Sequence, residues 1–226
     1  MPNPRRFGGA RFFAALIAAT AVAGIYTWKQ FHRVSSPSNR DAARLYSEGL
    51  ARLRVFDALA ACSLLQQAVA LDPKFSLAHS ALAEAWSRLG YDKNAKLEAR
   101  QAYDLSANLS REEKLLVEGR YRVINHENDE ATDVYRTLFT LFPDNLDYGL
   151  KLAAEQSASG KGNDALATIA ALHKLAPPAS EDARLELEEA KAWGALSDFN
   201  HQEPTLERTV EMATAQGSRL ILANAR

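Results

Sequence analysis

The chain has little of the residue types that cross-link a protein or favour strands. Cys62 is its only cysteine, so no disulfide can form within the chain. A free cysteine packs like a small apolar side chain, and we interpret Cys62 as such rather than as a reactive thiol. β-Branched residues are sparse after position 40, whereas Ala, Leu and Glu are frequent. The composition therefore predicts an all-α protein.

After its first 40 residues, the chain also has no excess of basic over acidic residues. Six of its 27 Lys and Arg residues lie in the first 40 positions, which leaves 21 basic residues against 28 acidic ones, a net charge of −7. A protein that binds nucleic acid is expected to present a basic face. We therefore predict no nucleic-acid partner.

No set of residues with the spacing of a catalytic motif is present. The segment 160–162, Gly-Lys-Gly, lacks the Walker spacing, and the segment 198–200, Asp-Phe-Asn, has none of the other kinase motifs near it. The histidines are far apart in sequence. His126 with Glu127 and Asp129 could hold a metal, but a solvated turn is the preferred interpretation. The sequence predicts no catalytic residue, no cofactor and no metal.

Prolines recur at the ends of apolar helical runs. From Pro143 to Pro177 is 34 residues, and from Pro73 to Pro143 is 70, or two units of about 35 with Ala107 in the middle position. Spacing by three and four residues keeps apolar side chains on one helix face. The pattern predicts four helix–turn–helix units.

Small residues recur at equivalent positions of these units, where two helices would cross closely. In the first helix they are Gly49, Ala83, Gly119 and Ala153. The second helix of each unit has three such positions: a small residue, a packing residue four positions later, and a further packing residue three positions after that. In chain order these triplets are Ala61, Leu65 and Ala68; Ala95, Ala99 and Ala102; Ala131, Tyr135 and Leu138; Ala165, Ile169 and Leu172.

This pattern resembles the tetratricopeptide (TPR) repeat. The resemblance implies a right-handed α-solenoid of antiparallel helix pairs, with repeats at 40–73, 76–107, 110–143 and 144–177. In this fold the first helix of each unit lines a concave groove that binds peptides. We therefore predict a peptide-binding groove that contains Tyr46, Leu50, Arg54, Ser80, Glu84, Arg88, Leu116, Arg120 and Ile124.

The segment 180–226 departs from the repeat register. It predicts a divergent fifth pair, with helices at 180–196 and 202–215 and Pro204 in the first turn of the second. Ser218–Arg226 then begins a further, truncated helix that contains Leu220, Ile221 and Leu222. Since a solenoid normally ends on a polar helix, we expect the chain either to self-associate through this end or to fray from Ser180 onward.

Residues 12–28 form an uncharged, apolar run flanked by basic residues. We predict an N-terminal membrane anchor at 1–33, a single transmembrane helix, followed by a Ser/Pro linker at 34–39. The alternative is a cleaved signal peptide, because Ala21-Val22-Ala23 has the form of a cleavage site. The excess of arginine before the run predicts that the repeats lie on the extracytoplasmic side of a bacterial inner membrane.

Three segments, 46–54, 78–87 and 109–118, are similar to the extracytoplasmic repeat regions of bacterial membrane-bound serine/threonine kinases and of related transmembrane winged-helix regulators. In such proteins the repeats bind other proteins, and catalysis lies in another domain. The leading prediction is a non-enzymatic, membrane-tethered scaffold for a protein or peptide partner. The alternative is a sensory or regulatory appendage, a fragment of such a kinase or regulator.

Overall fold

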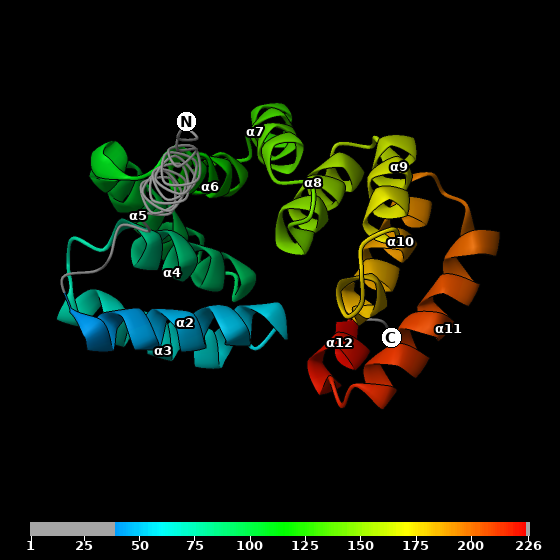
Figure 1. Ribbon diagram of the computed structural model, residues 1–226, viewed down its shortest axis with the longest axis horizontal. Helices are drawn as coiled ribbons and strands as arrows, with labels where there is room; N and C mark the ends of the chain where they lie inside the picture. The colour runs from blue at the N-terminus through cyan, green and yellow to red at the C-terminus, as the bar shows by residue number, and fades with distance from the viewer. Residues whose placement is uncertain (1–38, 225–226) are drawn as a thin grey trace, which may run out of the picture. The chain divides into compact units, whose positions relative to one another are not determined.

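The computed structural model describes residues 39–224, and every regular element in this range is helical (Figure 1). The α-helices are α2 (Arg40–Arg54), α3 (Ala58–Leu71), α4 (Ser76–Arg88), α5 (Asp92–Asp104), α6 (Arg111–Ile124), α7 (Asn128–Leu141), α8 (Leu146–Ala158), α9 (Gly162–Leu172), α10 (Ala183–Ala195), α11 (Phe199–Ala215) and α12 (Arg219–Asn224). Short 3₁₀ helices, η1 (Leu105–Asn108) and η2 (Ala179–Glu181), precede α6 and α10.

The helices pack as five consecutive pairs, from α2 with α3 to α10 with α11 (Figure 1). The first helix of a pair also contacts the first helix of the next pair: α2 contacts α4, α4 contacts α6, and α8 contacts α10. Because each pair packs against the next one along the chain, the described residues form an all-α solenoid.

The predicted anchor at 1–33 and the linker up to residue 38 lie outside the described residues. Among residues 39–224, no helix is both long enough and apolar enough to cross a membrane.

Local sequence signals set where the helices begin and end. Ser110 and Glu113 form the predicted capping box at the start of α6: the Ser110 amide donates to Glu113 Oε2 over 2.9 Å, and the Glu113 amide donates to Ser110 Oγ over 3.3 Å. Gly90 follows α4 with a φ of 78°, a left-handed conformation that glycine adopts without strain.

The small residues of the repeat pattern lie where helices of one pair cross. A Cβ on Gly49 would lie 2.7 Å from Leu65 Cγ, and one on Gly119 would lie 2.7 Å from Tyr135 Cε1. Leu65 and Tyr135 are themselves almost fully buried. The glycines therefore make room for the large residue of the partner helix.

We expect Gly49→Ala to lower the free energy of unfolding by about 1–3 kcal/mol, because the new methyl group would push Leu65 out of its packed position. Chemical denaturation monitored by circular dichroism measures this. The control is Gly194→Ala in α10, where the new methyl group meets only the flexible end of Gln202. Equal stability of the Gly49→Ala and wild-type chains would contradict the close crossing.

The fifth pair is packed like the others. Leu185 and Leu187 of α10 are 0 % and 1 % exposed. The second helix of the pair begins at Phe199, earlier than the predicted 202, because Asp198 Oδ1 accepts a hydrogen bond from the His201 amide over 3.3 Å. Pro204 therefore lies inside α11, and its predicted place in the first turn is wrong.

The turn after α2 contacts the C-terminal helices. Phe56 packs against a buried cluster that includes Leu187 of α10 and Ile221 of α12, and Ile221 is only 3 % exposed. In Figure 1 the end of α2 accordingly faces α12. The apolar residue at the centre of the predicted truncated helix is thus covered within the chain, and this arrangement gives no support to the predicted self-association.

Candidate functional site

Glu84 is the centre of a charged cluster that joins three first helices. Its Oε1 accepts from Arg88 Nη2 of the same helix over 2.6 Å. Its Oε2 accepts from Arg120 Nε of α6 over 2.7 Å and from Lys151 Nζ of α8 over 3.0 Å. Arg88 also donates to the Leu53 carbonyl over 2.7 Å, which connects the cluster to α2.

The cluster is mostly hidden from solvent, and this sets its electrostatics. The side chains of Glu84 and Arg120 are 13 % and 7 % exposed. Burial raises the pKa of Glu84, but the charges of Lys151, Arg120 and Arg88 outweigh burial and hold this pKa well below its usual range. Glu84 is therefore ionised at neutral pH and compensates three cations.

A second ionic group lies at the start of α8. Asp147 Oδ2 accepts from Arg54 Nε over 2.9 Å, and Asp147 Oδ1 accepts from Arg184 Nη1 over 2.8 Å. Burial raises the pKa of Asp147, but Arg184 and Arg54 reverse the effect and lower it. Asp147 thus links the end of the first helix, α2, to the start of the fifth pair.

A pocket of about 950 Å³ opens at this second group. Charged residues Arg54, Asp147 and Arg184 line it together with the apolar residues Leu146 and Pro178. Pockets that hold ligands commonly have this size and combine apolar walls with a few polar groups.

Two further carboxylates lie on α8 and α10. Glu188 is 7 % exposed; its Oε1 accepts from Lys191 Nζ over 2.8 Å, while its buried Oε2 has no hydrogen-bond partner among the described residues. Burial raises the pKa of Glu155 to about 7, an effect to which Glu188 and Glu84 add and which Lys151 opposes. Helix α8 therefore carries a carboxyl group whose pKa lies near neutral pH.

The raised pKa of Glu155 makes stability depend on pH. Between its ordinary value of 4.5 and about 7, the folded chain keeps a proton that the unfolded chain has released. The free energy of unfolding should therefore fall as the pH rises through this window. Glu155→Gln should remove that slope and be more stable than wild type at pH 8 by about 1–3 kcal/mol. Urea denaturation from pH 4.5 to about 8 measures this dependence of stability on pH, with Glu130→Gln at an exposed position as the control. If the stability of Glu155→Gln and of wild type changed with pH in parallel, the prediction would be contradicted.

Comparisons with known proteins bear on the fold. No protein-family model matches the chain, and no curated protein sequence matches it. A solved tetratricopeptide repeat protein from Parabacteroides merdae ATCC 43184 is similar with a TM-score of 0.56 and 13 % identity, over 95 % of this chain and 78 % of that one. The described residues have a TPR-like fold. A thermophilic TPR protein of Thermus thermophilus is similar with a TM-score of 0.52 and 14 % identity, over 81 % of this chain and 98 % of that one.

Five of the nine residues predicted to line the TPR groove come together around Glu84. Arg88 and Arg120 bind it, Arg120 Nη1 approaches Ser80 Oγ at 3.4 Å, and Tyr46 is near enough for Arg120 to lower its pKa against the raising effect of burial. The charges of Glu84, Arg88 and Arg120 thus compensate one another across the second and third repeats.

The other four predicted residues lie elsewhere. Arg54 lines the pocket beside Asp147. Leu50 packs against the core between the first two repeats, Leu116 packs beside Tyr135, and Ile124, 6 % exposed, packs among alanines of α4 and α5. Leu116 and Ile124 thus contribute to the layer between helices. The peptide-binding role of the nine residues stays a prediction.

The sequence reasoning missed the contributions of α8 and α10. Asp147, Lys151 and Glu155 follow one another at four-residue spacing, as the predicted residues of the earlier repeats do. The register of the earlier repeats continues at Leu150, three residues before Ala153, so it does not select these three residues. Glu188 carries no comparable signal, since the register loosens after residue 180.

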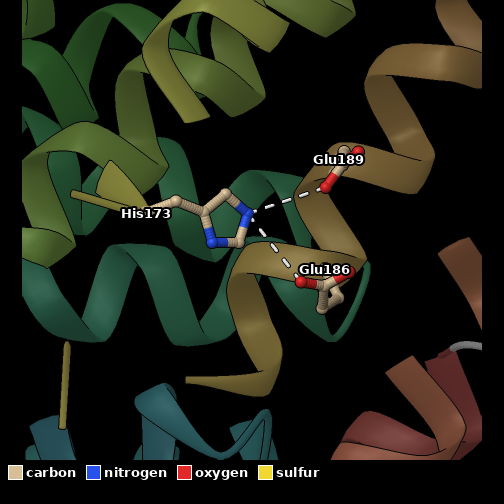
Figure 2. A group of neighbouring side chains, drawn as sticks. All are labelled: His173, Glu186 and Glu189. Atoms are coloured by element: carbon tan, nitrogen blue, oxygen red, sulfur yellow. Dashed lines mark ion pairs between the residues drawn. The ribbon is translucent and has the colours of Figure 1, made fainter. Parts of the chain in front are cut away.

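The turn at His126 does not gather the three residues that the sequence offered as a metal group. Glu127 Oε2 accepts from Arg122 Nη1 over 2.6 Å, and Asp129 Oδ1 accepts from Lys161 Nζ over 2.6 Å. Within residues 39–224, the group whose ligand atoms do converge is His173 with Glu186 and Glu189 (Figure 2). None of these three was predicted as a ligand.

Proposed function

We propose that the chain is a non-catalytic scaffold for protein–protein interaction, which binds a peptide or protein segment along its first helices. The TPR-like fold supports this, because a solenoid offers a long surface and needs no chemistry of its own. On those helices, charged side chains form two ionic groups: one around Glu84, from the second to the fourth repeat, and one around Asp147, which joins the first repeat to the fifth pair.

The pocket beside Asp147 is the observation that carries the proposal. It lies where the end of α2 and the beginnings of α8 and α10 meet. An extended segment could place an apolar side chain against Leu146 and Pro178. Its backbone or polar groups would then replace part of the contacts among Arg54, Asp147 and Arg184. Since most of the Glu84 cluster is buried, this pocket is the better entrance for a partner.

Membrane tethering is part of the proposal and rests on the sequence. The apolar run at 12–28, with basic residues on both sides, would hold the repeats at a bacterial inner membrane, on its extracytoplasmic side. The resemblance of the repeat segments to the extracytoplasmic regions of kinases and winged-helix regulators would make the same surface a sensory one.

Site-specific photo-crosslinking of the full chain in its own cell tests this function. A benzoylphenylalanine at Asp144, an exposed pocket residue, should give discrete protein adducts. The matched control is Leu97 on α5, which is 63 % exposed but lies on a second helix. We expect adducts at Asp144 that weaken when Arg54→Ala is added. The same adducts from both positions, or none from Asp144, would overturn the proposal.

A further inference from the structure

His173 and two glutamates of α10 point their side chains toward one another (Figure 2). His173 directly follows α9, and Glu186 and Glu189 lie three residues apart on α10, so both carboxylates reach the same side of that helix. His173 Nε2 is 3.8 Å from Glu186 Oε1 and 3.6 Å from Glu189 Oε2. The three ligand atoms all lie within 4.8 Å of one another.

These distances suit ligands of one ion better than direct hydrogen bonds. A hydrogen bond between nitrogen and oxygen is about 2.7–3.2 Å long. Two ligands bound tetrahedrally to zinc at about 2.1 Å stand roughly 3.4 Å apart. The observed separations of 3.6 and 3.8 Å are close to this value. The two carboxylate oxygens lie no more than 4.8 Å apart, so side-chain adjustments would bring all three atoms onto one cation.

The outer oxygens of both carboxylates are held by other side chains. Arg208 Nε donates to Glu186 Oε2 over 2.9 Å, and Trp193 Nε1 donates to Glu189 Oε1 over 3.2 Å. No hydrogen bond within residues 39–224 reaches the two inner oxygens, and Glu186 is only 8 % exposed. Contacts of this kind orient metal ligands. Arg208 Nη2 also lies 3.6 Å from Glu189 Oε1, so this guanidinium pairs with both carboxylates. Its single positive charge offsets one of their two negative charges, which leaves the group attractive to a cation.

We propose that His173, Glu186 and Glu189 bind a divalent transition metal of the zinc class. One imidazole nitrogen and two carboxylate oxygens supply three ligands, and water completes the coordination on the exposed side of His173. The imidazole favours zinc over magnesium or calcium, which take oxygen ligands. The bound ion ties the end of the fourth repeat to the fifth pair, across the connection that contains η2.

Isothermal titration of the full chain with Zn²⁺, after treatment with a chelator, tests the proposal. We expect one equivalent to bind, and Zn²⁺ to raise the melting temperature. His173→Ala should weaken binding by about tenfold or more and abolish the thermal shift. His126→Asn is the matched control: it removes a histidine from the other candidate turn, and Asn tolerates the positive φ of 63° there. Magnesium and calcium should bind at least about tenfold more weakly than zinc.

Each outcome supports or overturns the assignment. Equal zinc affinity of the wild-type and His173→Ala chains, or loss of binding in His126→Asn instead, would overturn the proposal. Glu189→Gln provides a second variant in case the His173→Ala protein folds poorly. The Glu189 side chain is 20 % exposed, and the substitution keeps its size while it removes the charged ligand. Binding that survives Glu189→Gln at full strength would also contradict the assignment.

Discussion

The free energy of unfolding of a Glu84→Ala chain is expected to fall by about 3–5 kcal/mol. Removal of this carboxylate leaves Arg120, whose side chain is 7 % exposed, without its ionic partner, and also releases Lys151 and Arg88. An uncompensated buried cation is far costlier than an unmade surface pair.

Chemical denaturation at neutral pH measures this loss, and Glu48→Ala is its matched control. Glu48 pairs with Arg44 at four-residue spacing on α2, over 2.7 Å, but both side chains are about half exposed at 47 % and 59 %. That pair should contribute less than about 1 kcal/mol. If the two variants lose the same stability, the Glu84 cluster does not join the repeats in the way described.

Leu65→Ala should lower the free energy of unfolding by about 2–5 kcal/mol. Leu65 is 0 % exposed and fills the space above Gly49 between the two helices of the first repeat. Its cluster also contains Ala81 and Leu82 of the second repeat. A cavity at this point therefore weakens both the pair and the contact between pairs.

Leu59→Ala is the control for this substitution. It makes the same chemical change on the same helix, α3, at a side chain that is 73 % exposed. Its effect should stay within about 0.5 kcal/mol. A Leu65→Ala chain that melts at the same temperature as Leu59→Ala would show that the repeat register is misassigned.

The sequence predicted the local part of the fold because each repeat encodes its own packing. Gly49 opposite Leu65 and Gly119 opposite Tyr135 are pairings within one unit, and their spacing is readable in the chain. The prolines gave the period, since α3 and α7 each end two residues before one of them.

Contacts between distant units could not be predicted in this way. Lys151 reaches Glu84 across two repeats, and Arg54 reaches Asp147 from the first repeat to the fourth. Such contacts depend on how far each pair rotates relative to the one before it. That rotation results from many small differences in packing, and no repeating sequence pattern reports it. The packing of Phe56 against the cluster that contains Ile221 also joins units far apart in the chain, and it helps to cover the C-terminal end.

Five helix pairs form one continuous array up to α12. Hydrogen–deuterium exchange of the full chain, read by mass spectrometry, tests this continuity. The packing predicts that amides of α10 and α11 are protected as strongly as those of α2 to α9, because Leu185 and Leu187 are as buried as Leu65. Rapid exchange from 183 to 215 beside slow exchange from 40 to 172 would contradict the claim.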